Sequence, residues 1–324
     1  MEPISRIDPS INQLYFRGFN ATYLAGTLDF ESVLYLLVHD SLPDADQRVE
    51  LEQRMIELRG LYKEEIQSLD ILVQSLDDIR DEHELCLFDT LLAFVTLCPL
   101  VIANQFTEIQ GRKAEDPHND FGLAANFLWM VQGRKPKETD LADFQTCLIL
   151  HMDDPDNPSL TALLHTLDEG SASEALHAAL SKHVGSLHHG AGTLAMSMFE
   201  EINKAEDAPS VLRKRLESNE KIYGMGHRIY KGVDPRAIVL RDMLKRRTLS
   251  TQSEWLVDVT DAVAREGAVL LSEWKGVQAY PNVDLYNAAA YSTFGFSPEL
   301  NTSLFAVSRA AGWMAHILEH NKLQ

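Results

Sequence analysis

The chain has 324 residues, of which 45% are hydrophobic and 24% are charged. This composition is typical of a soluble globular protein with one or two domains and excludes an intrinsically disordered chain. The 48 acidic residues outnumber 29 lysines and arginines, and the formal net charge of −19 disfavours nucleic acid and anionic membranes as partners.

The predicted elements are mostly helices. Residues 12–19, NQLYFRGF, form one of the few segments with a strand-like pattern, and they predict a short hairpin. Further along, the patterns predict a helix over 30–43 that stops just before its proline, a helix over 138–152, and an Ala-rich helix from 171 into Gly185. In residues 303–323 the apolar residues follow the three-four spacing of one helix face. We therefore expect an all-α fold.

The most apolar run of the chain, residues 85–106, raises the question of a membrane span. It contains Asp89, Pro99, Asn104 and Gln105. These groups would be costly in lipid, whereas a buried core helix tolerates them. We therefore expect a core helix here and no membrane partner.

The three cysteines, Cys86, Cys98 and Cys147, stand singly in apolar runs. Their placement predicts buried thiols in a reducing compartment and argues against disulfides. The first ten residues, MEPISRIDPS, have no basic and apolar signal segment. The expected location is the cytoplasm.

Histidines cluster at residues 183–189 without a metal-binding pattern. His183, His188 and His189 are five and one residues apart, and such spacings do not place two imidazoles on one helical turn. The acidic sequence DDPDN at 153–157 lacks the central glycine and terminal glutamate of a calcium loop. We expect no bound metal.

Positive charge gathers in residues 221–237, KIYGMGHRIYKGVDPRA. Its glycines would let a ligand approach the backbone while Lys231 reaches a phosphate. The alternative is a tight turn whose cations pair with the surplus acids, and spacing alone favours that reading.

The order of several segments changes this balance, because they resemble the citrate synthase family. GMGHRIYKGVDPRA (224–237) is similar to the family's G-x-G-H-R-V-Y-K-x-x-D-P-R-A, YPNVDLY (280–286) to its P-N-V-D segment, and GSLHHGAG (185–192) to a modified G-P-x-H-G-G-A-N. The resemblance covers nearly the whole chain, from RGF at 17–19 through ANFLWMVQGRKP at 125–136 to AVSRAAGWMAHILEH at 306–320.

The resemblance implies an enzyme that joins an acyl-CoA to a 2-oxo acid such as oxaloacetate. His188 would donate a hydrogen bond to the thioester carbonyl oxygen, Asp284 would remove an α-proton, and His227 would polarise the carbonyl of the oxo acid. Because a thioester α-proton is a very weak acid, its removal needs both a positioned carboxylate and a donor at the developing enolate oxygen.

The resemblance also assigns binding roles and an architecture. Arg236 and Arg309 match arginines that grip the oxo acid's carboxylates, which suits a planar guanidinium. Lys231 and the backbone of Gly224, Met225 and Gly226 match the region that meets CoA, so acyl-CoA is a substrate and no permanently bound cofactor is implied. The implied architecture is a homodimer of two-domain helical chains, with a large domain (1–192 and 293–324) and a smaller mobile one (193–292).

The residue types alone leave other roles open. His188 or His227 could be a core histidine bonded to backbone, and His189 is an alternative to His188. Asp284 near a helix start could serve as a cap or as a partner of the helix dipole. Arg309 could belong to a structural ion pair.

The sequence departs from the family pattern at the oxo-acid end. Where relatives read L-H-x-D-H-E this chain reads LHMDDPDN, so Asp154 replaces a histidine, and an aspartate would repel a dicarboxylate. HHGAG replaces H-G-G-A-N, and the sequence ends at HNKLQ before the R-P-R segment. Two hypotheses follow: a condensing enzyme with oxaloacetate or an altered 2-oxo acid as acceptor, or a non-catalytic paralogue with a CoA-binding or regulatory role.

Overall fold

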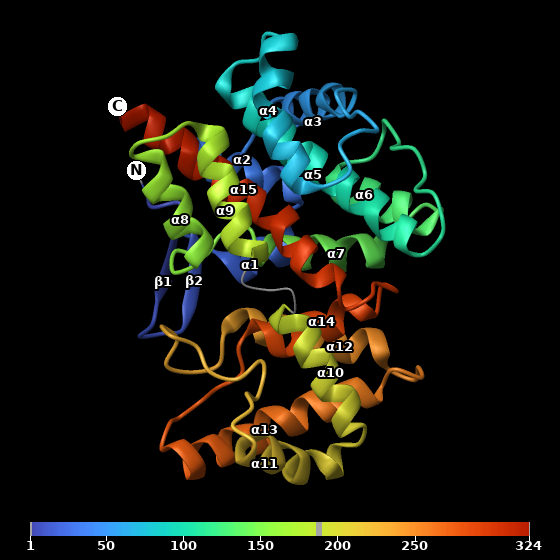
Figure 1. Cartoon of the computed structure of the whole chain (residues 1–324), viewed down its shortest axis with the longest axis vertical. Coiled ribbons are helices and arrows are strands. Elements are labelled where there is room, and N and C mark those ends of the chain that lie inside the picture. The colour runs from blue at the N-terminus through green and yellow to red at the C-terminus, as the bar shows by residue number, and fades with distance from the viewer. Residues whose placement is uncertain (1, 186–189, 324) are drawn as a thin grey trace. The chain divides into compact units, whose positions relative to one another are not determined.

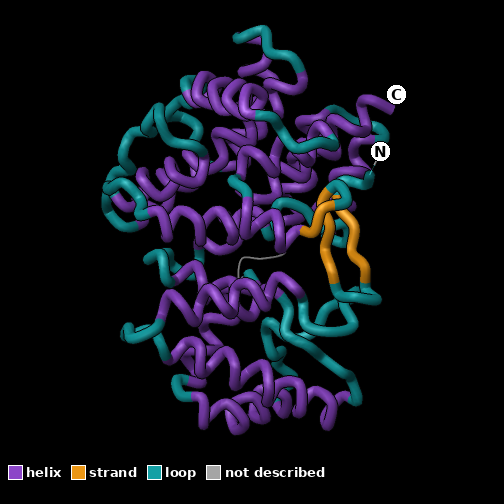
Figure 2. Tube along the Cα trace, turned by 180° about the vertical axis from the view of Figure 1, so that it is seen from behind, coloured by secondary structure: helices purple, strands orange, loops and turns teal. Residues whose placement is uncertain are grey.

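The computed structural model describes residues 2–185 and 190–323. Helices, purple in Figure 2, make up most of these residues, and the strands, orange, gather in one place. The predicted all-α fold class is therefore confirmed.

The elements run in the order shown in Figure 1. They are β1 (Ser5–Asp8), β2 (Gln13–Phe16), β3 (Phe19–Asn20), α1 (Ala21–Thr27), α2 (Phe30–His39), α3 (Ala45–Arg59), α4 (Leu69–Glu82), α5 (Leu87–Ile109), α6 (Leu123–Gln132), α7 (Glu138–Ile149), α8 (Pro158–Leu167), α9 (Ala172–Gly185), α10 (Ala191–Ile202), the 3₁₀ helix η1 (Ala205–Asp207), α11 (Ala208–Glu217), α12 (Pro235–Thr248), α13 (Trp255–Lys275), α14 (Val283–Ser292) and α15 (Leu300–Leu323).

The predicted hairpin at residues 12–19 is confirmed as the pair β2–β3. The two strands are antiparallel, with Tyr15 opposite Asn20. Arg17 and Gly18 between them both have positive φ, 46° and 79°, which is the turn geometry that matches the twist of paired strands. Strand β1 was not predicted, and it extends the sheet in the order β1-β2-β3.

The predicted helices are present, but two of them end earlier than expected. Helix α2 ends at His39 because Asp40 adopts the left-handed conformation with φ 60°, which stops a helix before any proline is reached. Helix α7 ends at Ile149 rather than at residue 152. Helix α9 reaches Gly185, as predicted.

The chain forms two compact units, each built from more than one segment. The first unit comprises Met1–Arg6, Tyr15–Ser186 and Ser303–Gln324, and the second comprises Ile7–Leu14 and Leu187–Thr302. The sequence-based division, with 193–292 as a smaller mobile domain, stays a prediction.

The core of the first unit forms around α5. By length and apolar composition this helix could cross a membrane, but 78% of its most apolar stretch is buried inside the unit. It packs against α3, α4 and α6, and its Phe94 stacks on Trp313 of α15 with ring centroids 6.5 Å apart. The expected core helix is confirmed.

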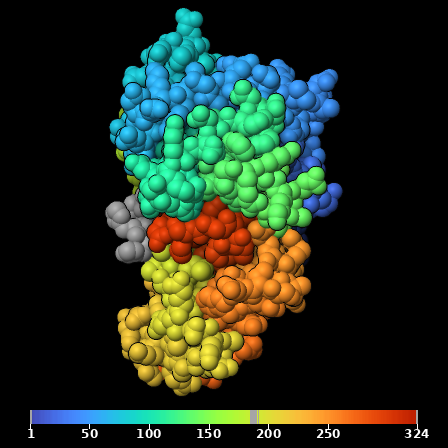
Figure 3. Space-filling model, turned by 90° about the vertical axis from the view of Figure 1, so that its right-hand side faces the viewer, coloured from blue at the N-terminus to red at the C-terminus, as the bar shows by residue number. Residues whose placement is uncertain are grey.

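The core of the second unit forms around α13 and α14. Helices α11 and α13 lie side by side, as do α12 and α14 (Figure 1), and α10 packs on α14 as well. Leu285 and Ala289 of α14 are fully buried in this packing. In the space-filling view the yellow and orange atoms of the unit form one continuous body (Figure 3).

The cysteine prediction is correct for two residues and wrong for the third. Cys98 and Cys147 are buried, and burial raises the pKa of the Cys98 thiol well above its usual range. Cys86 is exposed, because it is the N-cap of α5 and lies at the helix end, where its Sγ accepts the N–H of Asp89. The apolar run predicts the helix but not that its first residue faces solvent.

Candidate active site

In the second unit, two segments far apart in the sequence lie side by side. Residues 224–226 run antiparallel to residues 280–282, with Met225 bridging Pro281. The N–H of Asn282 donates to the carbonyl of Gly224 (2.9 Å), and the N–H of Gly226 donates to the carbonyl of Tyr280 (2.7 Å). The GMGH and PNVD segments are thus joined by backbone hydrogen bonds.

Gly224 makes this approach possible. It has a φ of +80°, and a Cβ built on it would lie 2.5 Å from the Cα of Leu285 in α14. A side chain would therefore strain the backbone and also collide with main-chain atoms that cannot rotate away. The glycine accordingly has a packing role in the structure, in addition to any contact it makes with a ligand.

Asp284 lies in the first turn of α14 and is partly buried. The helix is capped by Asn282, whose Oδ1 accepts the N–H of Asp284 at 2.9 Å. The Asp284 side chain is therefore not the cap that its position near a helix start allowed. Its carboxylate lies in the first turn, at the positive end of the helix dipole.

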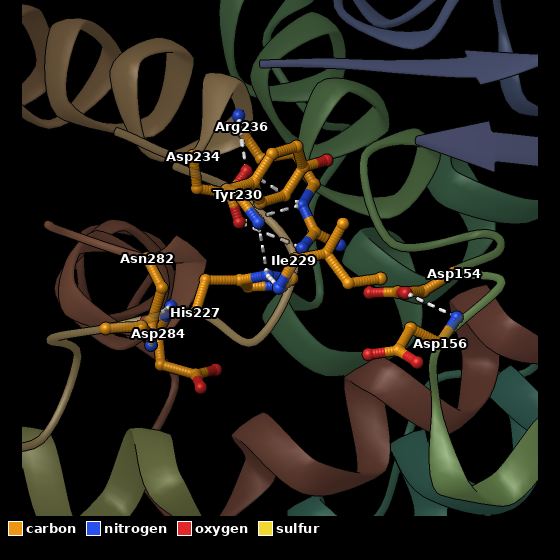
Figure 4. Close-up of polar contacts among 10 residues, drawn as sticks. Asp154, Asp156, His227, Ile229, Tyr230, Asp234, Arg236, Asn282 and Asp284 are labelled. Atoms are coloured by element: carbon orange, nitrogen blue, oxygen red, sulfur yellow. Dashed lines mark hydrogen bonds and ion pairs between the residues drawn. The ribbon is translucent and has the colours of Figure 1, made fainter. Parts of the chain in front are cut away.

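His227 follows the loop and has a defined tautomer. Its Nδ1 accepts hydrogen bonds from the N–H groups of Ile229 (3.1 Å) and Tyr230 (3.3 Å), as Figure 4 shows. Because both partners are donors, Nδ1 carries a lone pair and the neutral ring holds its proton on Nε2. The arrangement gives His227 a fixed N–H donor of the kind that can polarise a carbonyl oxygen.

Arg236 is engaged with a carboxylate of its own chain. It is 2% exposed, and its Nε and Nη2 donate to Asp234, which is fully buried. Asp234 also caps α12 by accepting the N–H of Arg236 at 2.9 Å. Arg236 thus pairs with an acidic side chain of its own chain, as the alternative interpretation of this segment expected. Binding of an oxo acid by Arg236 stays a prediction.

The other cations of the segment lie at the surface. The side chains of Lys221, Arg228 and Lys231 are exposed, and the backbone N–H of Lys231 donates to Asn12 Oδ1 at 3.1 Å. Exposed cations in a chain with a net charge of −19 are suited to an anionic group of a ligand.

The remaining predicted binding residues belong to the first unit, and both are buried. Arg309 is 1% exposed, and its Nε donates to the carbonyl of His151 at 2.9 Å. Asp154 is 8% exposed, and its Oδ1 accepts the N–H of Asp156 at 3.1 Å. This turn orients Asp154, the residue at which the sequence departs most clearly from the family pattern.

Asp153, which was not predicted to be a site residue, connects β1 and α15 through its carboxylate. Its fully buried Oδ2 accepts from the hydroxyl of Ser5 and lies 3.0 Å from His316 Nε2. Burial acts to raise the pKa of Asp153, but the nearby His316 and Arg309 outweigh it, and the pKa lies below the usual value. Arg309 and His316 are two helical turns apart on one face of α15, a spacing that could have suggested a shared carboxylate partner.

His188 and His189 lie outside the described residues, so the choice between them stays a prediction. Within residues 2–185 and 190–323, no group of three or more histidine, cysteine, aspartate or glutamate side chains could hold a metal ion. The second unit thus contains His227, Asp284 and the 224–226 loop, and the first unit contains Asp154 and Arg309.

Comparison with known proteins assigns this chain to a family. Residues 2–324 match the family model described as the citrate synthase C-terminal domain. The chain belongs to the citrate synthase family. It is 32% identical to citrate synthase 2 of Bacillus subtilis over 94% of this chain and 86% of that protein. It is 28% identical to the 2-methylcitrate synthase of Mycobacterium tuberculosis over 98% of this chain and 83% of that protein.

The solved structure of citrate synthase from Thermotoga maritima aligns with a TM-score of 0.84 at 27% identity, covering 98% of this chain and 88% of that one. The resemblance seen in the sequence is therefore confirmed at the level of family and fold. As a member of the citrate synthase family, the chain belongs to a group of acyl-transferring enzymes.

Proposed function

We propose that this chain condenses an acyl-CoA, acetyl-CoA or propionyl-CoA, with oxaloacetate or a related 2-oxo acid through an enolised thioester. The observation that carries the proposal is the pair of groups in the second unit. His227 presents a fixed Nε2–H donor, and Asp284 presents a carboxylate in the first turn of α14.

The first step is enolisation of the thioester. Asp284 takes a proton from the carbon next to the thioester carbonyl, and His188 donates a hydrogen bond to the oxygen on which negative charge develops. The two actions belong together, because a carboxylate removes such a weakly acidic proton only when the enolate is stabilised at the same time.

In the second step the enolised carbon attacks the 2-oxo carbonyl carbon and forms a carbon–carbon bond. His227 donates to the carbonyl oxygen, which becomes the hydroxyl of the product. Water then cleaves the thioester, so that the acceptor gains a carboxymethyl or substituted carboxymethyl group and free CoA leaves.

The binding residues have matching roles. Arg236 and Arg309 hold carboxylates of the oxo acid, because a guanidinium can donate two parallel hydrogen bonds to a carboxylate. Lys231 and the backbone of Gly224, Met225 and Gly226 contact CoA. Acyl-CoA acts as a substrate, and the reaction calls for no permanently bound cofactor.

This chain departs from the family pattern at a residue proposed to lie near the acceptor. Asp154 is a potential anion at a position where the family pattern has a histidine. Loss of one partner of a bound charge costs about 2–5 kcal/mol, or roughly thirty-fold to several-thousand-fold in affinity. We infer weak use of oxaloacetate and better use of a 2-oxo acid with one carboxylate or a less charged tail.

The setting of the enzyme is also a proposal. We infer a cytoplasmic homodimer that acts on small substrates, in the tricarboxylic acid cycle if oxaloacetate is the acceptor, with no nucleic acid or membrane partner. Light scattering of the purified protein measures the oligomeric state, and a mass of one chain would contradict the dimer.

Exchange of acyl-CoA α-protons with deuterium from solvent, followed by NMR, tests the proposal without requiring the correct acceptor. Wild type should catalyse exchange, and Asp284→Asn should abolish it while CoA binding persists, because only the base is lost. Asp258→Asn is the matched control, since Asp258 also lies in the first turn of a helix of the second unit. Absence of exchange by the wild type, even with oxo-acid analogues present, would favour a non-catalytic paralogue.

A further inference from the structure

We propose that Asn282 is a positioning residue, whose side-chain amide holds the loop that leads to His227 at a fixed distance from the helix that carries Asp284. The inference rests on the proposed function, since it concerns the placement of that function's base and its carbonyl-polarising histidine. The resemblance to the family assigned no role to Asn282.

The two ends of the Asn282 amide bind two different segments. Its Oδ1 accepts the N–H of Asp284 at 2.9 Å, and its Nδ2 donates to the carbonyl of Gly226 at 2.7 Å. One partner is only a donor and the other only an acceptor, so the amide has a single orientation that satisfies both. Figure 4 shows Asn282, Asp284 and His227 on their elements.

Gly226 has open space on the side where a Cβ would stand, so packing on that side does not restrict its conformation. A Cβ built on Gly226 would have only the Ala279 Cβ near it, at 4.0 Å, and its φ is +89°. Glycine in this conformation has wide conformational freedom. What fixes it is hydrogen bonding: its N–H donates to Tyr280 O at 2.7 Å and its carbonyl accepts from Asn282. His227 is the next residue along the chain, so its position depends on these bonds.

Asparagine is the side chain that can do both jobs here. Serine or aspartate at this position could still cap α14, because each offers a short side-chain oxygen. Serine has one polar atom, one bond closer to the backbone than the asparagine Nδ2, so a hydroxyl that caps the helix is too short to reach the carbonyl of Gly226 as well. Aspartate has the length but no proton to donate, and it would place an anion against that carbonyl oxygen. The requirement for a donor and an acceptor on one short side chain therefore distinguishes a positioning role from simple helix capping.

The variant Asn282→Ser separates the two roles, since it keeps the cap and removes the donor. We expect its kcat for thiol release, or its α-proton exchange rate, to fall about 10- to 100-fold, because small misplacements of catalytic groups have effects of this size. The KM for acyl-CoA should change by a smaller factor than kcat, because the Asn282 side chain holds Gly226 alone among the residues proposed to contact CoA. The control is Asn20→Ser, since Asn20 caps α1 in the first unit through its Oδ1.

The thermal midpoint gives the second comparison. Asn282→Ser and Asn20→Ser should both unfold close to wild type, whereas Asn282→Ala, which loses cap and donor together, should unfold earlier. A wild-type kcat in Asn282→Ser would overturn the proposal and leave only a cap. The proposal would also be overturned if Asn282→Ser lost kcat and its thermal midpoint fell by more than that of Asn20→Ser.

A structural readout keeps this inference separate from the proposed function. The imidazole NMR signals of His227, assigned with a His227→Gln variant, should shift in Asn282→Ser and stay unchanged in Asn20→Ser. If wild type catalyses no exchange, the proposed function fails, while a shifted imidazole still supports the positioning role. Unshifted His227 signals in Asn282→Ser would contradict it.

Discussion

Replacing Gly224 with alanine should destabilise the second unit and displace its catalytic base. Gly224 has a φ of +80°, and a Cβ there would lie 2.5 Å from the Cα and 2.6 Å from the Cβ of Leu285. Non-bonded carbon atoms prefer separations of about 3.5–4.0 Å, so the loop and α14 must move apart. Asp284 precedes Leu285 in the chain and would move with it.

The expected magnitude has two parts. The left-handed backbone costs alanine about 1–2 kcal/mol, and overpacking against a rigid neighbour adds about 1–3 kcal/mol. The total of about 2–5 kcal/mol is a large share of the 5–15 kcal/mol that typically holds a domain together.

Gly295→Ala isolates the first part. Gly295 also lies in the second unit and has a φ of +83°, but no atom lies within 4 Å of a Cβ built on it. Urea unfolding followed by circular dichroism should therefore show a smaller loss for Gly295→Ala, by about 1–3 kcal/mol. The α-proton exchange rate should fall only in Gly224→Ala. Equal losses of stability in the two variants would refute the collision with α14 as the cause.

Three further predictions concern the first unit. Burial raises the pKa of the Glu31 carboxyl above its ordinary value of 4.5, so folding disfavours its ionisation. The free energy of unfolding of wild type should therefore fall relative to that of Glu31→Gln as the pH rises above about 4.5. Urea unfolding of both proteins at a series of pH values should show a difference that grows above about pH 4.5 and disappears below it. Asp154→His should improve thiol release with oxaloacetate relative to a 2-oxo acid with one carboxylate, and rapid wild-type turnover with oxaloacetate would contradict the altered acceptor. A thiol reagent should modify Cys86 in the native protein, whereas the two buried cysteines should react only after unfolding. Fast reaction of a second cysteine in the native protein would contradict this prediction.

The helical fold could be predicted because apolar spacing along the chain repeats the geometry of a helix face. The ends of the helices were harder to predict, because each end depends on the backbone conformation of a single residue. Asp40 terminates α2 by adopting a positive φ, and neither its residue type nor the following proline indicates this. Cys86 illustrates the same limit, because an apolar run does not say which of its residues faces solvent.

The candidate site was predicted residue by residue, but the contacts among its residues were not. A motif can mark His227 and Asp284, yet the tautomer of His227 depends on two backbone donors that meet it only in the folded loop. Asn282 precedes a helix-like run, a recognised capping signal. Its second bond, to the carbonyl of Gly226, joins segments more than fifty residues apart and is a property of the tertiary structure alone.

The division of the chain between its two units has a consequence for synthesis on the ribosome. Residues Ile7–Leu14 emerge early, but the rest of their unit ends at Thr302, and the first unit in turn awaits the segment Ser303–Gln324. Neither unit can be completed until synthesis has passed Thr302, a delay of roughly 15–60 s at typical elongation rates. During that interval the apolar surface of α5, later covered in part by Trp313, stays accessible to chaperones, so the core of the first unit is expected to close only after α15 has been synthesised.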